Sequence, residues 1–139
     1  MEKFLRRKAP ELEERYGIHF SDERIKLITR RTAESQTDVD VAVDEIKAIH
    51  QAALGFARRF SGRNEVEISF TEGAIDSLVE KIWENGRDPL DYLNQAFQNY
   101  EHGLKLIKEK TGKRDFPIPA EGMENQEKYL NRLIQETYR

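Results

Sequence analysis

The sequence contains no cysteine, which excludes disulfide bonds, thiolate catalysis and zinc sites built from cysteine. It has no apolar run near the roughly 20 residues that a membrane-spanning helix requires. The N-terminal residues MEKFLRRKAPELEER include basic side chains but lack the apolar core of a signal peptide. These absences fit a reducing compartment, and we expect a cytoplasmic protein with no membrane partner.

A large excess of charge of either sign is also missing. The chain has 23 basic and 26 acidic side chains, so its formal net charge is -3. A general nucleic-acid-binding protein is expected to have net positive charge or a basic face, so we expect no nucleic-acid partner. The length of 139 residues is sufficient for a compact domain with a buried core.

The sequence lacks the common catalytic motifs. It has no G-x-x-x-x-G-K-[ST] segment, no apolar strand that ends in paired acids, and no G-x-S-x-G segment. We therefore expect no catalytic residue in this chain, and no ATP hydrolysis by the chain alone. The histidines His19, His50 and His102 have no His-x-x-x-His or Glu-x-x-His spacing, so no metal site is predicted, and His50 is interpreted as a half-buried structural residue.

Two charged clusters flank the longest predicted helix. The acidic cluster at its start lacks the glycine and the terminal glutamate of a calcium loop, so we interpret it as carboxylates that stabilise a helix N-terminus. The basic residues near its end complement the helix dipole, and phosphate binding there is a weaker alternative. The clusters are Asp38, Asp40, Asp44 and Glu45, and Arg58, Arg59 and Arg63.

Hydrophobic periodicity predicts a mainly α protein, a compact bundle of five or six helices with one or two short strands. The longest helix begins at Thr37 or Asp38, is ended by Gly62, and has a broad apolar face. This face comprises Val39, Val43, Ile46, Ile49, Ala53, Leu54, Phe56, Ala57 and Phe60. Further helices are predicted from Pro89 to near Gly112 and over 123–138, and the two prolines within 113–119 predict an extended segment between them. Within the final helix, Leu130, Leu133, Ile134 and Tyr138 are expected to face inward.

The N-terminal residues predict an arm followed by a short helix from Pro10 to Gly17, because proline suits the first position of a helix and glycine its end. Residues 18–20 predict a short strand, and Ser21 predicts the cap of the next helix. The segment 18–28 aligns without gaps to 68–78. This similarity is either an internal repeat or the ordinary appearance of a strand followed by a capped helix.

The stretch from Val66 to Phe97 has the clearest order of elements. The alternation at residues 66, 68 and 70 predicts a strand, and Thr71 then predicts a helix cap. The helix that follows ends at Asn85-Gly86, Arg87 lies in the break, and Asp88-Pro89 predicts the start of the next helix.

This order, strand, FTEGA, helix, glycine, arginine, helix, resembles the small helical lid domain of Clp-type AAA+ ATPases. The resemblance implies that Arg87 is the sensor 2 residue, which binds nucleotide phosphates. It also implies ATP as the cofactor, held with a separate P-loop domain in the same parent chain or in neighbouring subunits, and a cytoplasmic, chaperone-type homo-oligomer. Residues 1–17 would then form an N-terminal arm and helix, and residues 18–139 a helical lid-like domain.

Two functions follow from the sequence. The first is a lid domain that senses bound nucleotide and contributes to subunit contacts, without catalytic motifs of its own. The second is a stand-alone helical interaction or regulatory domain with no nucleotide role. Clp-type lids usually have G-A-R-G-L-R at this point, whereas this chain has GRDPL. The spacing between the arginine and the leucine is therefore one residue longer here. This difference leaves Arg63 or Lys81 as an alternative sensor to Arg87.

Overall fold

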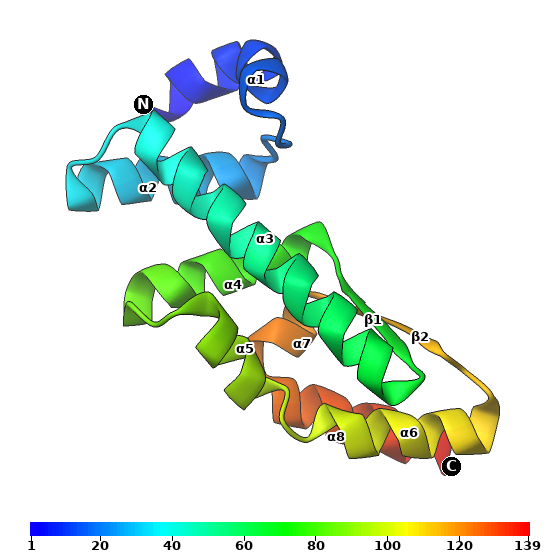
Figure 1. Cartoon of the computed structure of the whole chain (residues 1–139). Helices are drawn as coiled ribbons and strands as arrows, with labels where there is room; N and C mark the ends of the chain where they lie inside the picture. Colours follow the sequence, from blue (N-terminus) through cyan, green and yellow to red (C-terminus); the bar gives the residue numbers. More distant parts are fainter. The chain divides into compact units, whose positions relative to one another are not determined.

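The chain is mainly helical with two short strands, which confirms the predicted fold class (Figure 1). The computed structural model describes all residues from 1 to 139. Eight helices form rather than five or six, because two of the predicted helices are each interrupted by a turn. The elements are α1 (Glu2–Tyr16), α2 (Asp22–Ser35), α3 (Val39–Asn64), β1 (Glu67–Phe70), α4 (Glu72–Asn85), α5 (Pro89–Ala96), α6 (Tyr100–Thr111), β2 (Asp115–Ile118), α7 (Ala120–Glu124) and α8 (Gln126–Thr137).

The contacts within the chain group it into two compact units, residues 1–48 and residues 49–139. The first unit contains α1, α2 and the beginning of α3. The second contains the rest of α3 and every later element. The division at residue 17 that was expected from the sequence stays a prediction.

Helix α1 begins at Glu2, so the predicted arm before Pro10 is wrong. Pro10 lies inside the helix, where the missing N–H and the ring cost about 3 kcal/mol. The N-terminal half nevertheless stays helical, because Leu5 is completely buried and anchors it. Gly17 ends the helix as predicted, with φ of 71° and an N–H that donates to the Glu13 carbonyl at 2.9 Å.

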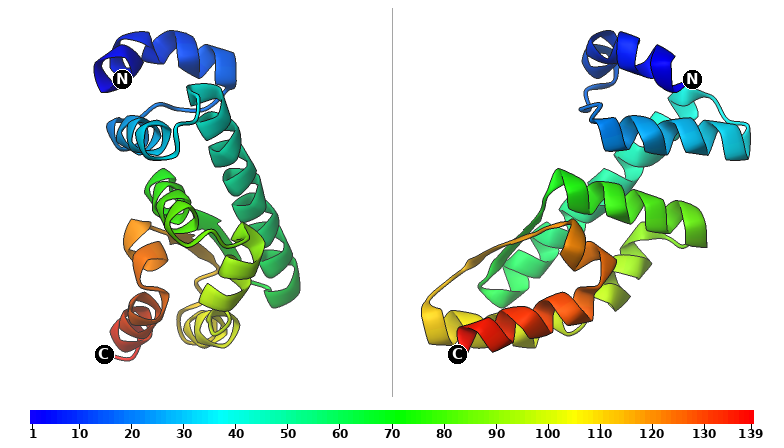
Figure 2. Two further views of the ribbon diagram at one scale, coloured as in Figure 1. Left: turned by 90° about the vertical axis from the view of Figure 1, so that its left-hand side faces the viewer. Right: turned by 180° about the vertical axis from the view of Figure 1, so that it is seen from behind.

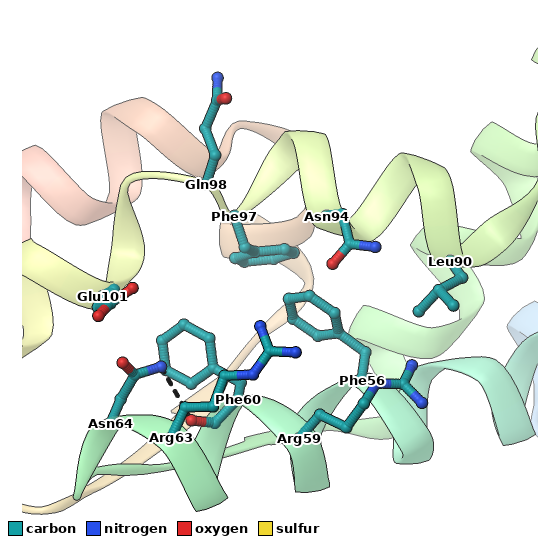
Figure 3. A pocket seen from close by; sticks show the side chains of 10 residues that line it. All are labelled: Phe56, Arg59, Phe60, Arg63, Asn64, Leu90, Asn94, Phe97, Gln98 and Glu101. Atoms are coloured by element: carbon teal, nitrogen blue, oxygen red, sulfur yellow. Dashed lines mark hydrogen bonds between the residues drawn. The ribbon is translucent and has the colours of Figure 1, made fainter.

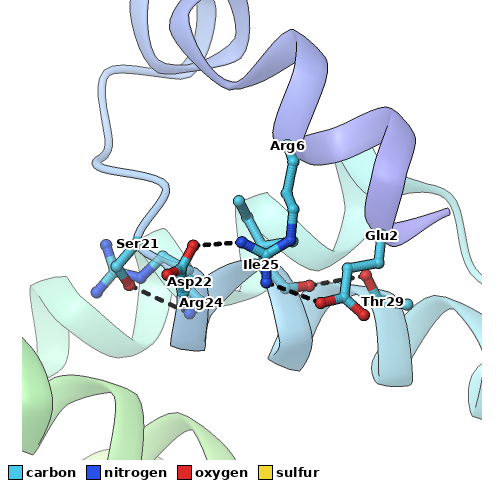
Figure 4. A network of polar contacts seen from close by, with 7 residues as sticks. All are labelled: Glu2, Arg6, Ser21, Asp22, Arg24, Ile25 and Thr29. Carbon is cyan, nitrogen blue, oxygen red and sulfur yellow. Dashed lines mark hydrogen bonds and ion pairs between the residues drawn. The ribbon is translucent and has the colours of Figure 1, made fainter.

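Polar contacts join α1 to the start of α2 (Figure 4). The Arg6 guanidinium donates to Glu2 at 2.9 Å and to Asp22 at 2.5 Å, and these bonds raise the pKa of Arg6, with the bond to Glu2 the larger cause. These groups are exposed, and exposed ion pairs contribute little to stability. The two helices are therefore held together mainly by buried apolar side chains such as Leu5, Ile25 and Ile28.

The two similar segments 18–28 and 68–78 share their caps but not their strands. Ser21 accepts a hydrogen bond from the Arg24 N–H at 3.2 Å, and Thr71 accepts one from the Ala74 N–H at 3.1 Å, so both caps are confirmed. Residues 67–70 form β1, whereas residues 18–20 form no strand, which corrects the prediction. The reason is that β1 is paired with β2, and an extended segment without a pairing partner is not stable as a strand.

Helix α3 begins at Val39 and ends two residues later than predicted, because it continues through Gly62 to Asn64. Glu65 then adopts a left-handed conformation with φ of 58°, which makes it the residue that ends the helix. The apolar face is buried as predicted at most positions, including Ile46 and Phe56. Leu54 is an exception, since it is 40% exposed and lies outside the core.

Strands β1 and β2 form a two-stranded parallel sheet, in which Glu67 pairs with Asp115 and Phe70 with Ile118. The crossover between them runs through α4, α5 and α6. The extended segment predicted over 113–119 thus becomes the second strand, and Figure 2 shows both strands running side by side. Helix α7 packs on α4 and on α8, so the residues after β2 return to the same core.

The predicted helix after Pro89 is divided into α5 and α6 by a turn over 97–99. This turn contains Asn99, a poor helix former, and it allows the rings of Phe97 and Tyr100 to meet edge to face with centroids 4.6 Å apart. The predicted final helix is likewise divided at Asn125, whose side chain accepts from the Lys128 N–H at 3.1 Å. Leu130 is buried as predicted, but Tyr138 is 54% exposed and does not face inward.

Tyr100 supplies a pH-dependent contribution to stability. Its side chain is buried, its hydroxyl donates to the Gln126 carbonyl at 2.6 Å, and burial raises its pKa above the ordinary value near 10. The folded state therefore holds this proton more tightly than the unfolded state does. The resulting stability is complete below about pH 10 and decreases as the pH rises above it.

We expect Tyr100→Phe to lower the free energy of unfolding by about 0.5 to 1.5 kcal/mol at neutral pH, because one buried hydrogen bond is lost. The variant should also lose less stability than the unaltered protein between pH 8 and pH 11. Urea denaturation across this range measures both effects. Equal alkaline losses in the two proteins would contradict the assignment to Tyr100.

Candidate functional site

The break between α4 and α5 has the local structure that the sequence predicts. Gly86 ends α4 with φ of 65°, and its N–H donates to the Ile82 carbonyl at 2.8 Å. Asp88 caps α5 by accepting a hydrogen bond from the Asp91 N–H at 3.1 Å. Because both helix ends are stabilised by these contacts, the backbone of Arg87 is held between two defined anchors.

The Arg87 side chain is exposed and folds back over α5. It donates to the Gln95 side-chain oxygen at 2.6 Å, and its guanidinium carbon lies 5.6 Å from the centre of the Tyr92 ring. Both of these partners are electrically neutral. The guanidinium is positively charged and forms no ion pair at this helix junction.

The two alternative sensor residues lie elsewhere in the second unit. Lys81 is half-buried on α4, one turn before the end of the helix. Arg63 is exposed on the last turn of α3 and lines a cavity together with Arg59. Arg87 and Lys81 do not line this cavity, so the three candidate sensor residues are not brought into one site.

The cavity beside Arg63 lies between the end of α3 and the α5–α6 segment and has a volume of about 200 Å³ (Figure 3). Its walls include three phenyl rings and six polar side chains. The lining residues are Phe56, Arg59, Phe60, Arg63, Asn64, Leu90, Asn94, Phe97, Gln98 and Glu101. Figure 3 shows Asn64 and Glu101 at one end of the cavity, Leu90 at the other, and the rings between them.

Asn64, Asn94, Gln98 and Glu101 line this cavity and were not identified from the sequence, and Asn64 is the buried one among them. It is only 3% exposed, its Nδ2 donates to the Phe60 carbonyl at 2.9 Å, and its Oδ1 has no hydrogen-bond partner. An asparagine near a helix end is common as a cap, so no sequence signal distinguishes it. Asn64 lines a cavity that forms only where α5 and α6 lie against α3.

Two side chains of the acidic cluster at the start of α3 contact other residues of the first unit. The Tyr16 hydroxyl donates to Asp40, and Arg31 forms an ion pair with Glu45 at 2.8 Å. Asp44 is exposed. Asp40 lies in the first turn of α3, where the helix dipole favours a carboxylate. No group of three or more His, Cys, Asp or Glu side chains in the structure is arranged to hold a metal ion.

The three histidines have different surroundings. The His19 Nδ1 lies 3.5 Å from a Glu13 carboxylate oxygen, and His50 is half-buried, as predicted. His102 lines a second cavity of about 540 Å³ between the α5–α6 turn and α8, where most other polar side chains are neutral amides. These side chains can donate and accept hydrogen bonds.

Comparison with known proteins does not assign the chain to a family: no protein-family model, no curated protein and no solved structure matches it. None of its helices has both the length and the apolar character needed to cross a membrane. The function must therefore be inferred from the geometry described above and from the sequence resemblance at the α4–α5 junction.

Proposed function

We propose that this chain is the lid domain of an AAA+ ATPase and that Arg87 senses the phosphates of the bound nucleotide. The observation that carries the proposal is the exposed guanidinium of Arg87, which contacts only the neutral groups of Gln95 and Tyr92. Such a cation can form charge-assisted, bidentate hydrogen bonds to phosphate oxygens without first breaking an ion pair.

The surrounding structure supports this role mechanically. Helix α4 follows β1 directly, packs on α7 and is capped by Thr71, so Arg87 moves together with a packed unit rather than on a loose segment. When the terminal phosphate is present, a contact to Arg87 would hold the lid against a separate P-loop domain. Loss of the phosphate would release the lid as a rigid body. The P-loop domain binds ATP and supplies the catalytic residues, and it belongs to the same parent chain or to a neighbouring subunit.

The test is made in the ATPase that carries this segment. Arg87→Ala should lower nucleotide affinity or steady-state turnover about tenfold to a hundredfold, because one charge-assisted contact is worth roughly 1.5 to 3 kcal/mol. Arg87→Lys should restore activity only in part, since an ammonium cannot reproduce the planar guanidinium. Nucleotide affinity and ATP hydrolysis are measured for each variant.

The matched control is Arg58→Ala, because Arg58 is also an exposed arginine but lies on α3 and does not line the cavity. This variant should hydrolyse ATP at the rate of the unaltered protein. If Arg87→Ala has unchanged affinity and turnover, Arg87 is not a sensor, and Arg63→Ala and Lys81→Ala are then measured in the same assay. Unchanged values for all three would favour a helical interaction domain instead.

A further inference from the structure

The cavity at the end of α3 is lined by two arginine side chains that have no acidic partner in the protein. Arg59 and Arg63 are one helical turn apart, both are exposed, and neither forms an ion pair. Like charges four residues apart on a helix repel each other. The Arg59 guanidinium lies against the face of Gly55, where the absence of a side chain leaves it space, with its nitrogens 3.8 and 3.9 Å from the position of a Cβ atom. This arrangement suits a bound anion.

Asn64 adds a second and independent requirement. Its side-chain nitrogen is assigned by the hydrogen bond to the Phe60 carbonyl, since a carbonyl can only accept. The Asn64 side-chain atom that has no hydrogen-bond partner is therefore the Oδ1 acceptor, and Asn64 is one of the residues that line the cavity. Buried acceptor atoms normally have a hydrogen-bond donor. The protein provides none for Asn64 Oδ1, so a bound ligand could supply the missing N–H or O–H donor.

The remaining lining residues limit the size and charge of that ligand. Glu101 contributes a carboxylate at the same end as Asn64, and its ion pair with Lys105 at 3.3 Å only partly offsets this negative charge. A ligand with several negative charges would be repelled. The volume of about 200 Å³ lies below the range of roughly 300 to 1,000 Å³ of pockets that enclose whole drug-sized ligands. One small anionic group with one apolar side chain fits these limits.

We infer that this cavity binds the C-terminal residue of a peptide that ends in an apolar side chain. The terminal carboxylate contacts the guanidinium groups of Arg63 and Arg59. The N–H of the same residue donates to Asn64 Oδ1, and its side chain packs against the rings of Phe60 and Phe97. Capture of a terminal carboxylate is a known mode of peptide recognition. This binding activity is separate from the sensing role of Arg87 and does not depend on it.

The experiment uses the 139-residue chain and the peptide N-acetyl-Ala-Ala-Phe with a free carboxylate, followed by NMR titration of the ¹⁵N-labelled protein. The amide signals of residues that line the cavity, including the Asn64 side chain, should shift on binding. The same peptide with a C-terminal amide should bind about tenfold to a hundredfold more weakly, because the charge-assisted contacts are lost. N-methylation of the terminal phenylalanine should weaken binding about twofold to tenfold, because Asn64 Oδ1 then loses its donor.

Protein variants test the same contacts from the other side. Arg63→Gln should weaken binding of the free-acid peptide at least about tenfold and leave the affinity for the amidated peptide unchanged. Arg58→Gln is the matched control, because this exposed neighbour does not line the cavity, and it should bind both peptides like the unaltered chain. These substitutions are at exposed positions, so folding is preserved.

Equal affinities for the free-acid and the amidated peptide would overturn the inference, as would equal effects of Arg63→Gln and Arg58→Gln. Inorganic phosphate is titrated in parallel. If phosphate shifts the cavity signals while the free-acid peptide does not, the cavity is a simple anion site and not a peptide site. None of these results bears on Arg87, whose test uses ATP hydrolysis by the parent protein.

Discussion

Replacement of Phe56 by alanine is expected to lower the free energy of unfolding by about 3 to 5 kcal/mol. The ring is 6% exposed and lies 5.9 Å from the Phe97 ring, 6.1 Å from that of Phe60 and 6.4 Å from that of Phe70, measured between centroids. Its removal takes apolar surface out of the core and leaves a cavity that α3 and α5 cannot close without moving. Urea denaturation followed by far-UV circular dichroism measures the loss.

The control for this prediction is Asp44→Ala on the same helix. Asp44 is exposed, so its replacement should change stability by about 0.5 kcal/mol or less. Ile46→Ala, at a position that is 1% exposed, should cost about 2 to 5 kcal/mol. Equal effects at Phe56 and Asp44 would mean that the buried face of α3 is assigned incorrectly.

Replacement of Ile118 by alanine is expected to destabilise the protein by about 2 to 5 kcal/mol. Ile118 is the last residue of β2, is completely buried, and its carbonyl accepts from the Thr71 N–H at 3.1 Å. Its Cγ2 atom lies only 2.8 Å from where a Cβ on Gly122 would be, so the side chain fills the space that the glycine leaves open. Truncation therefore leaves a void between β2 and α7.

The matched control is Asp115→Ala, at the other end of the same strand, where the side chain is exposed. This change should be nearly neutral, within about 0.5 kcal/mol. Chemical denaturation measures the free energy of unfolding of both variants. A loss at Ile118 no larger than the loss at Asp115 would contradict the burial of the Ile118 side chain between β2 and α7.

Local signals in the sequence determined most helix boundaries. The caps at Ser21, Thr71 and Asp88 and the glycine ends at 17, 86 and 112 lie where the residue types predicted them. These features depend on neighbouring backbone groups within four residues, so they are present in the sequence itself. The same holds for the junction at Arg87, which was found from its sequence and whose local structure is confirmed, while its sensing role stays a prediction.

Features that depend on distant residues were decided by the tertiary structure alone. Residues 18–20 and 68–70 have similar sequences, yet only the second segment is a strand, because a strand needs a partner and β2 lies about 50 positions later in the chain. In the same way, α1 continues through Pro10 because burial of Leu5 offsets the cost of the proline, and the Asn64 cavity exists only where α3 meets α5 and α6. Burial and strand pairing are properties of segments that meet in space, so no local pattern of residues contains them.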